Sequence, residues 1–172
     1  MKELILGGAR SGKSTLAQRH ARQSELKVIY IATAAAMDEE MTARIARHRK
    51  ERPNDWKLAE EPLALANTLQ ENAAPDHCLI VDCLTLWLSN LLAAEKNCLE
   101  IEKQALLSTL PELSGDVILV SNEVGQGIVP TNPLARRFRD EAGWLHQAVA
   151  QHCERVIFTV AGLPLTLKDT LL

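Results

Sequence analysis

The chain has 172 residues and a formal net charge of −3, so no sequence-wide positive field attracts nucleic acid or an anionic membrane. Hydrophobic residues make up 47% and charged residues 24%, a composition that suits one α/β domain over residues 1–172. No apolar run approaches the roughly 20 residues of a transmembrane helix, and the N-terminal one is too short for a signal peptide, so we expect a cytoplasmic protein without nucleic-acid partners.

Short apolar runs alternate with helical patterns along the chain, which predicts a parallel sheet covered by helices. No repeat or linker divides the sequence, so a single domain is expected. The predicted strands are residues 4–6, 28–31, 79–81, 117–120 and 156–160. The predicted helices are residues 14–23, 38–51, 63–72, 84–94, 99–110 and 133–152.

A glycine-rich segment joins the first predicted strand to the first predicted helix: Gly7, Gly8, Ala9, Arg10, Ser11, Gly12, Lys13 and Ser14. It fits the P-loop pattern G-x-x-x-x-G-K-[ST] in the context that this motif requires. Its backbone N–H groups can converge on phosphate oxygens, at the positive end of the following helix. We expect Lys13 to reach the β- and γ-phosphates of a nucleoside triphosphate, and the Ser14 hydroxyl to ligate Mg²⁺. The alternative is a glycine-rich turn that binds nothing.

Residues 38–53 begin with acids, continue with bases and close on Pro53, which predicts a helix matched to its own dipole. His48 shares one face of this helix with apolar residues, as an ordinary core histidine would. Several bases surround it in the sequence, namely Arg44, Arg47, Arg49, Lys50 and Arg52. Positive charge favours the neutral, nucleophilic imidazole, which can attack phosphorus and form a covalent nucleotidyl intermediate. Packing and catalysis both remain open for His48 on this pattern.

Asp82 ends an apolar strand, where ligands gather at the carboxyl edge of a parallel sheet. Besides the Ser14 hydroxyl, a P-loop site needs an acidic group for its metal. Asp82 offers this group and can hold Mg²⁺ directly or through water. Because Asp82 also precedes a helical run, the alternative is a helix N-cap. The two roles do not exclude each other.

Taken together, these residues resemble the family of bifunctional adenosylcobinamide kinases / adenosylcobinamide-phosphate guanylyltransferases of cobalamin biosynthesis. The matching blocks cover nearly the whole chain in the family's order: residues 7–14, 30–34, 38–56 with its Arg-x-x-Arg-His-Arg core, 81–87, 120–130 and 137–143. The resemblance implies a RecA-like P-loop fold, with a mostly parallel sheet and helices on both faces. It also implies a homo-oligomer, and we expect a trimer.

The activity implied by this resemblance has two steps. Adenosylcobinamide is first phosphorylated with ATP or GTP, and GMP from GTP is then joined to that phosphate, giving adenosylcobinamide-GDP and pyrophosphate. By the family pattern His48 carries the GMP as a guanylyl-histidine. Nucleotide contacts are implied at the P-loop and at Ala32, Thr33, Ala34, Arg49, Lys50, Glu51, Arg52, Glu60 and Asp82.

Two of these implied contacts also make physical sense. Residues 32–34 follow a predicted strand and should lie at the sheet edge that carries the P-loop. The Glu60 carboxylate can accept from the N1–H and the 2-amino group of guanine, although it also fits one half of a solvated pair with Glu61.

The polar, glycine-rich segment 122–127 follows another strand and is expected to line the corrinoid or phosphate-acceptor site, unless it is a plain turn.

Two other functions stay open at this stage. One is a small-molecule kinase in which His48 is structural, and the other is a nucleotide-gated binding protein, although the Asn-Lys-x-Asp motif of regulatory GTPases is absent. The chain departs from the family in one place. After Gly143 the family usually has a basic residue and an Asn before Gln147, where this chain has Trp144, Leu145 and His146. We expect His146 to lie on the helix surface and not to act as a catalyst.

Overall fold

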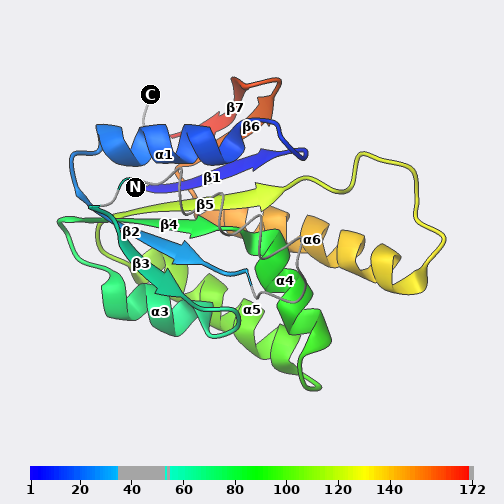
Figure 1. The fold of residues 1–172 in the computed structure, drawn as a ribbon. Helices are drawn as coiled ribbons and strands as arrows, with labels where there is room; N and C mark the ends of the chain where they lie inside the picture. Colours follow the sequence, from blue (N-terminus) through cyan, green and yellow to red (C-terminus); the bar gives the residue numbers. More distant parts are fainter. Residues whose placement is uncertain (35–52, 54, 171–172) are drawn as a thin grey trace.

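The computed structural model describes residues 1–34, 53 and 55–170. Their strands form one seven-stranded sheet in the order β3-β2-β4-β5-β1-β6-β7 (Figure 1). All neighbouring pairs are parallel except β6–β7, which are antiparallel. The strands are β1 (Lys2–Gly7), β2 (Lys27–Ala32), β3 (Lys57–Glu60), β4 (His77–Asp82), β5 (Asp116–Asn122), β6 (Arg155–Val160) and β7 (Leu163–Asp169). The predicted mostly parallel sheet is confirmed.

All five predicted strands are present, and each belongs to the inner part of the sheet. The sequence analysis missed β3 and β7, the two edge strands. Inner strands are covered on both faces and read as continuous apolar runs, whereas edge strands carry no such run. Lys57–Glu60 is largely exposed, and β7 contains Pro164, which an edge strand tolerates because one side of it needs no hydrogen bonds.

The helices agree with the prediction to within two residues at each end. They are α1 (Lys13–Gln23), α3 (Leu65–Asn72), α4 (Leu84–Ala93), α5 (Cys98–Thr109) and α6 (Pro133–His152), with a 3₁₀ turn η1 (Leu110–Glu112) after α5. The start of α6 is fixed by Asn132, whose side-chain oxygen accepts from the backbone N–H groups of Leu134 and Ala135 at 2.8 and 3.3 Å. The predicted helix 38–51 lies outside the described residues.

Helices cover both faces of the sheet, as predicted (Figure 1). Helix α1 packs Leu16, Ala17 and Ala21 against one face. Helices α3, α4, α5 and α6 cover the other face and bury the larger core, in which Trp87 is fully enclosed. Within the described part of the chain, no helix combines the length and apolar character needed to cross a membrane.

The parallel register brings distant parts of the sequence to one edge. Gly7 at the end of β1 pairs with Asn122 at the end of β5, and Ala32 at the end of β2 pairs with both Asp82 and Glu60. The segments that follow these residues therefore leave the sheet at its carboxyl edge, where ligands of open α/β sheets bind.

Candidate functional site

The P-loop, residues 7–14, lies at the carboxyl end of β1 and begins α1. The Lys13 Nζ donates to the carbonyl oxygen of Gly8 at 3.0 Å, and the Leu16 N–H donates to Gly12 O at 2.9 Å. Gly12 has a φ of 95°, in the left-handed region that glycine tolerates. The loop is therefore curled around its own lysine, in the strand–loop–helix context that the motif predicts.

The turn between β6 and β7 supports the P-loop from behind. The Gly162 N–H donates to Ser11 O at 2.9 Å, and a Cβ built on Gly12 would lie 3.1 Å from Gly162 Cα. The hydroxyls of Ser11 and Thr159 are buried and have no hydrogen-bond partner among the described residues. Buried hydroxyls of this kind normally have a partner, so the floor of the loop has polar capacity that a bound ligand or water can satisfy.

Gly7 has no room for a side chain. A Cβ at this position would overlap the Ser11 hydroxyl and would stand 2.6 Å from Thr159 O, a backbone atom that cannot move without shifting β6. We expect Gly7→Ala to lower the free energy of unfolding by about 2–4 kcal/mol, measured by urea denaturation. Gly8→Ala is the matched control because nothing lies within 4 Å of its added Cβ. Equal stability of Gly7→Ala and the wild type would contradict this packing.

Lys13 and Asp82 form the charged centre of the site. Lys13 is 8% exposed, and burial lowers the pKa of its amine, while the negative charge of Asp82 acts in the opposite direction. The Tyr30 hydroxyl donates to Asp82 Oδ2 at 2.7 Å and orients the carboxylate. Tyr30 was missed by the sequence analysis because it sits inside an apolar strand. Asp82 belongs to β4, and the N-cap of α4 is Cys83, so the N-cap alternative for Asp82 is wrong.

The residues at this centre suit Mg²⁺. The Ser14 hydroxyl and the Asp82 carboxylate are hard oxygen donors, and Tyr30 has already fixed the orientation of the acid. No group of three or more His, Cys, Asp or Glu side chains among the described residues could hold a metal. The protein would therefore supply few ligands and leave the others to phosphate oxygens and water, as Mg²⁺ sites with nucleotides commonly do.

A buried polar network links the segments that follow β2, β4 and β5. Thr33 is fully buried, and its hydroxyl donates to Cys83 O at 2.7 Å and accepts from the Cys83 N–H at 2.9 Å. Thr85 accepts from the Asn122 side-chain amide at 2.8 Å and lies 3.2 Å from Cys83 Sγ. Thr33 thus lies at the predicted edge, and its hydroxyl is hydrogen-bonded to the backbone of Cys83, which follows β4.

Glu60 ends β3 beside Ala32, and its exposed side chain lies at the same edge. The Glu61 N–H donates to Ala32 O at 3.0 Å, while its carboxylate accepts from the backbone N–H groups of Leu63 and Ala64. The Glu61 carboxylate is therefore engaged in the turn that precedes α3, so Glu60 and Glu61 are not equivalent. Asn90 of α4 bridges the segments that follow β2 and β3, because its side chain donates to Thr33 O and to Pro62 O.

The predicted surface position of His146 is wrong. This side chain is buried in α6, and its Nε2 lies 2.7 Å from the fully buried Ser121 hydroxyl. Its Nδ1 lies 4.0 Å from Glu123 Oε2, and the Glu123 N–H donates to Gly7 O at 2.9 Å. The face that α6 turns to the sheet includes position 146, a choice that depends on how the helix is rotated in the tertiary structure.

Burial lowers the pKa of His146 below its ordinary value of 6.5, with the charge of Glu123 opposing the shift. The folded protein then binds fewer protons at this ring than the unfolded chain, so stability falls as the pH drops below about 6.5. We expect His146→Gln to lose less stability than the wild type between about pH 7.5 and about pH 5, in urea titrations. The same loss in both proteins would show that the ring titrates normally.

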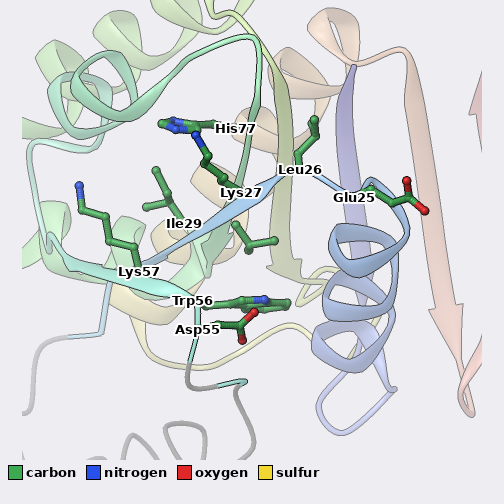
Figure 2. Close-up of a pocket in the computed structure, with 9 residues that line it drawn as sticks. Glu25, Leu26, Lys27, Ile29, Asp55, Trp56, Lys57 and His77 are labelled. Carbon is green, nitrogen blue, oxygen red and sulfur yellow. The ribbon is translucent and has the colours of Figure 1, made fainter.

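A hollow of about 470 Å³ lies elsewhere on the sheet (Figure 2). Lys27, Lys57 and His77 line it and begin β2, β3 and β4, so this is the amino end of the sheet, roughly 16 Å from Ala32 at about 3.3 Å a residue. Lys27 Nζ pairs with Asp76 at 2.7 Å, and Lys57 Nζ and the His77 ring bond to Asn72. The basic groups of this hollow are thus engaged with Asp76 and Asn72 of the protein itself.

The remaining predicted site residues lie outside the described residues. They are His48, Arg49, Lys50, Glu51 and Arg52.

A family model described as cobinamide kinase / cobinamide phosphate guanyltransferase matches residues 3–167 of the chain. This chain belongs to that family. The resemblance stated from the sequence is confirmed, and the chain is a bifunctional cobinamide kinase and cobinamide-phosphate guanylyltransferase of cobalamin biosynthesis. The family match supports both activities over a kinase alone or a nucleotide-gated binding protein.

Relatives of this kinase and guanylyltransferase cover nearly the whole of its length. The bifunctional adenosylcobalamin biosynthesis protein CobP of Pseudomonas aeruginosa is 62% identical over 169 residues, which are 98% of each chain. The protein CobU of Salmonella typhimurium, with the same description, is 38% identical over 185 residues, 98% of this chain and 100% of that one.

A solved structure similar to the enzyme shares its fold. The Pyrococcus horikoshii protein PH0250 has a TM-score of 0.52 at 8% identity, over 98% of this chain and 86% of that chain. The RadB recombinase has a TM-score of 0.48 at 18% identity, over 91% of this chain and 73% of that chain. The predicted α/β class, with a mostly parallel sheet and the P-loop between β1 and α1, is confirmed.

Proposed function

We propose that the enzyme performs both reactions at the nucleotide site on the carboxyl edge of its sheet, within a single catalytic domain of residues 1–172. The observation that carries this proposal is the convergence of the P-loop, Asp82, Ala32 and Glu60 at that edge. Phosphate-binding and base-binding groups are then available to one nucleotide. The substrates are ATP or GTP and adenosylcobinamide.

In the kinase reaction the P-loop holds the triphosphate and Lys13 neutralises charge on the transferred phosphoryl group. The Lys13 amine now bonds to Gly8 O and is buried, so its stem is already directed into the loop. The Ser14 hydroxyl and Asp82 would hold Mg²⁺, which would partly neutralise the negative charge of the phosphates. The aminopropanol hydroxyl of the corrinoid attacks the γ-phosphorus, the bond between this phosphorus and the β-phosphate oxygen breaks, and the nucleoside diphosphate leaves. The hydroxyl proton passes to solvent.

In the transfer reaction the His48 imidazole attacks the α-phosphorus of GTP, an N–P bond forms and pyrophosphate leaves. A phosphate oxygen of adenosylcobinamide phosphate then attacks the same phosphorus, the N–P bond breaks and adenosylcobinamide-GDP forms. The sequence supports this role through the bases around His48, and Arg49, Lys50, Glu51 and Arg52 would contact the nucleotide. Residues 32–34 and Glu60 would hold the guanine.

Different residues support the proposed corrinoid site and the proposed homo-oligomer. Residues 122–127 leave β5 beside Gly7 and would line the acceptor side of the site. On β7, Leu163, Leu165 and Leu167 are each more than half exposed along an edge strand, a surface that contact with another copy would cover. This surface supports a homo-oligomer. A trimer and a cytoplasmic location are further parts of the proposal.

A labelling experiment tests the proposal. The full chain is incubated with Mg²⁺ and GTP that carries label at either the α- or the γ-phosphate, with and without adenosylcobinamide, and is then denatured. We expect the α-label to stay on the protein in an acid-labile, base-stable bond, and the γ-label to appear on the corrinoid. Absence of both labels from the protein under all conditions would refute a covalent guanylyl intermediate.

A further inference from the structure

Asn90 joins two loops of the candidate nucleotide site from behind. It lies in the second half of α4, and its side-chain nitrogen Nδ2 donates to Thr33 O at 2.8 Å and to Pro62 O at 3.0 Å. Both partners are backbone carbonyl oxygens, so only the amide nitrogen, with its two hydrogens, can satisfy them together. One side chain therefore uses both of its N–H bonds to connect the segment after β2 with the segment after β3.

The rest of α4 strengthens this connection. Trp87, one turn earlier on the same helix face, donates from Nε1 to Leu63 O at 2.8 Å and is fully buried. The loop after β3 is thus held at two successive carbonyl groups by side chains of a helix packed into the core. The loop after β2 is held at Thr33 by Asn90 and, through its hydroxyl, by Cys83.

These two loops carry the groups assigned above to the guanine base. Residues 32–34 form one side, and Glu60 ends β3 two residues before Pro62 on the other. We propose that Asn90 is a positioning residue for guanine recognition, which fixes the distance between residues 32–34 and Glu60. This inference rests on the proposed function of Glu60. A carboxylate discriminates between bases only if it is held in register with their edge, so a fixed spacing of the loops supplies selectivity without contact with the nucleotide.

Inosine triphosphate provides the probe, because it differs from GTP only by the missing 2-amino group that Glu60 would bind. In Asn90→Asp a carboxylate oxygen replaces the donating nitrogen at almost unchanged volume and faces two carbonyl oxygens. We expect the preference for GTP over inosine triphosphate, as the ratio of kcat/KM in guanylyl transfer, to fall about tenfold, the effect of one charged hydrogen bond. The KM for GTP should rise while kcat at saturating GTP stays within about twofold.

Three further single variants and one double variant make the outcome decisive. Asn90→Ala removes the donor without adding charge and should reduce the preference in the same way. Asn72→Asp is the matched control, because Asn72 also donates from Nδ2 to a backbone carbonyl, that of Thr68, but lies in α3 away from the site, and it should keep the wild-type preference. Glu60→Gln should lose the preference directly, and adding Asn90→Asp to it should cause no further loss.

The two levels of the proposal fail differently. If Glu60→Gln keeps the wild-type preference for GTP, the guanine contact is wrong and the role of Asn90 falls with it. If Glu60→Gln loses the preference but both folded Asn90 variants retain it, only the positioning role is overturned. Melting temperatures of every variant identify any that fail to fold, and an equal rise of KM for both nucleotides would also overturn the role in base selection.

Discussion

Lys13→Met is expected to lower kcat/KM of the cobinamide kinase reaction by about a thousandfold, because it removes the one buried cation of the P-loop from the charge that develops on the transferred phosphoryl group. Methionine keeps the length and apolar stem of lysine, so the loop should retain its fold. The measurement is steady-state phosphorylation of the corrinoid with ATP or GTP over a range of nucleotide concentrations. The loss should not be recovered at saturating nucleotide, since the interaction matters most in the transition state.

Lys27→Met is the matched control for this change. Lys27 begins β2 at the opposite edge of the sheet, and its amine forms an exposed ion pair with Asp76, an interaction of small energetic value. We expect its kinase activity to remain within about twofold of the wild type. Equal, small effects of Lys13→Met and Lys27→Met would remove Lys13 from the kinase mechanism.

His48→Ala is expected to abolish guanylyl transfer, with a loss of at least about a thousandfold, while phosphorylation of the corrinoid continues. The physical reason is that only the transfer reaction needs a nucleophile on the protein, whereas the phosphoryl group passes directly from nucleotide to hydroxyl. The measurements are intact mass of the protein after incubation with GTP, which should lack the added GMP, and the conversion of corrinoid phosphate to corrinoid-GDP.

Two controls separate nucleophilic catalysis by His48 from a structural role. His152→Ala removes an exposed histidine at the last position of α6, and it should keep the guanylyl adduct. Kinase activity of His48→Ala at the wild-type level shows that its P-loop is intact. An adduct of GMP that persists in His48→Ala would mean that another side chain carries the nucleotide, and loss of both activities together would point to misfolding.

The sequence was sufficient for the features that depend on local pattern. The P-loop at residues 7–14 was recognised because its glycines, lysine and serine are contiguous and stand between a strand and a helix. The inner strands and the helices were found for the same reason, as burial on both faces leaves a continuous apolar run and an amphipathic helix leaves a period of 3.6 residues. Each of the family blocks is also a run of contiguous residues, so their series could be recognised from the sequence, and it indicated the activity.

The tertiary structure decided which side chains meet across the sheet edge. Tyr30 and Asp82 are far apart in the chain, as are Asn90 and the two carbonyl groups that it bridges, and only the pairing of β2 with β3 and β4 brings them together. His146 was misplaced because the periodicity of α6 leaves its rotation uncertain by about one residue, and contact with Ser121 on β5 determines which residue is buried. Local pattern thus determines what each segment is, whereas strand register and helix rotation, which arise from packing between distant segments, determine what each side chain touches.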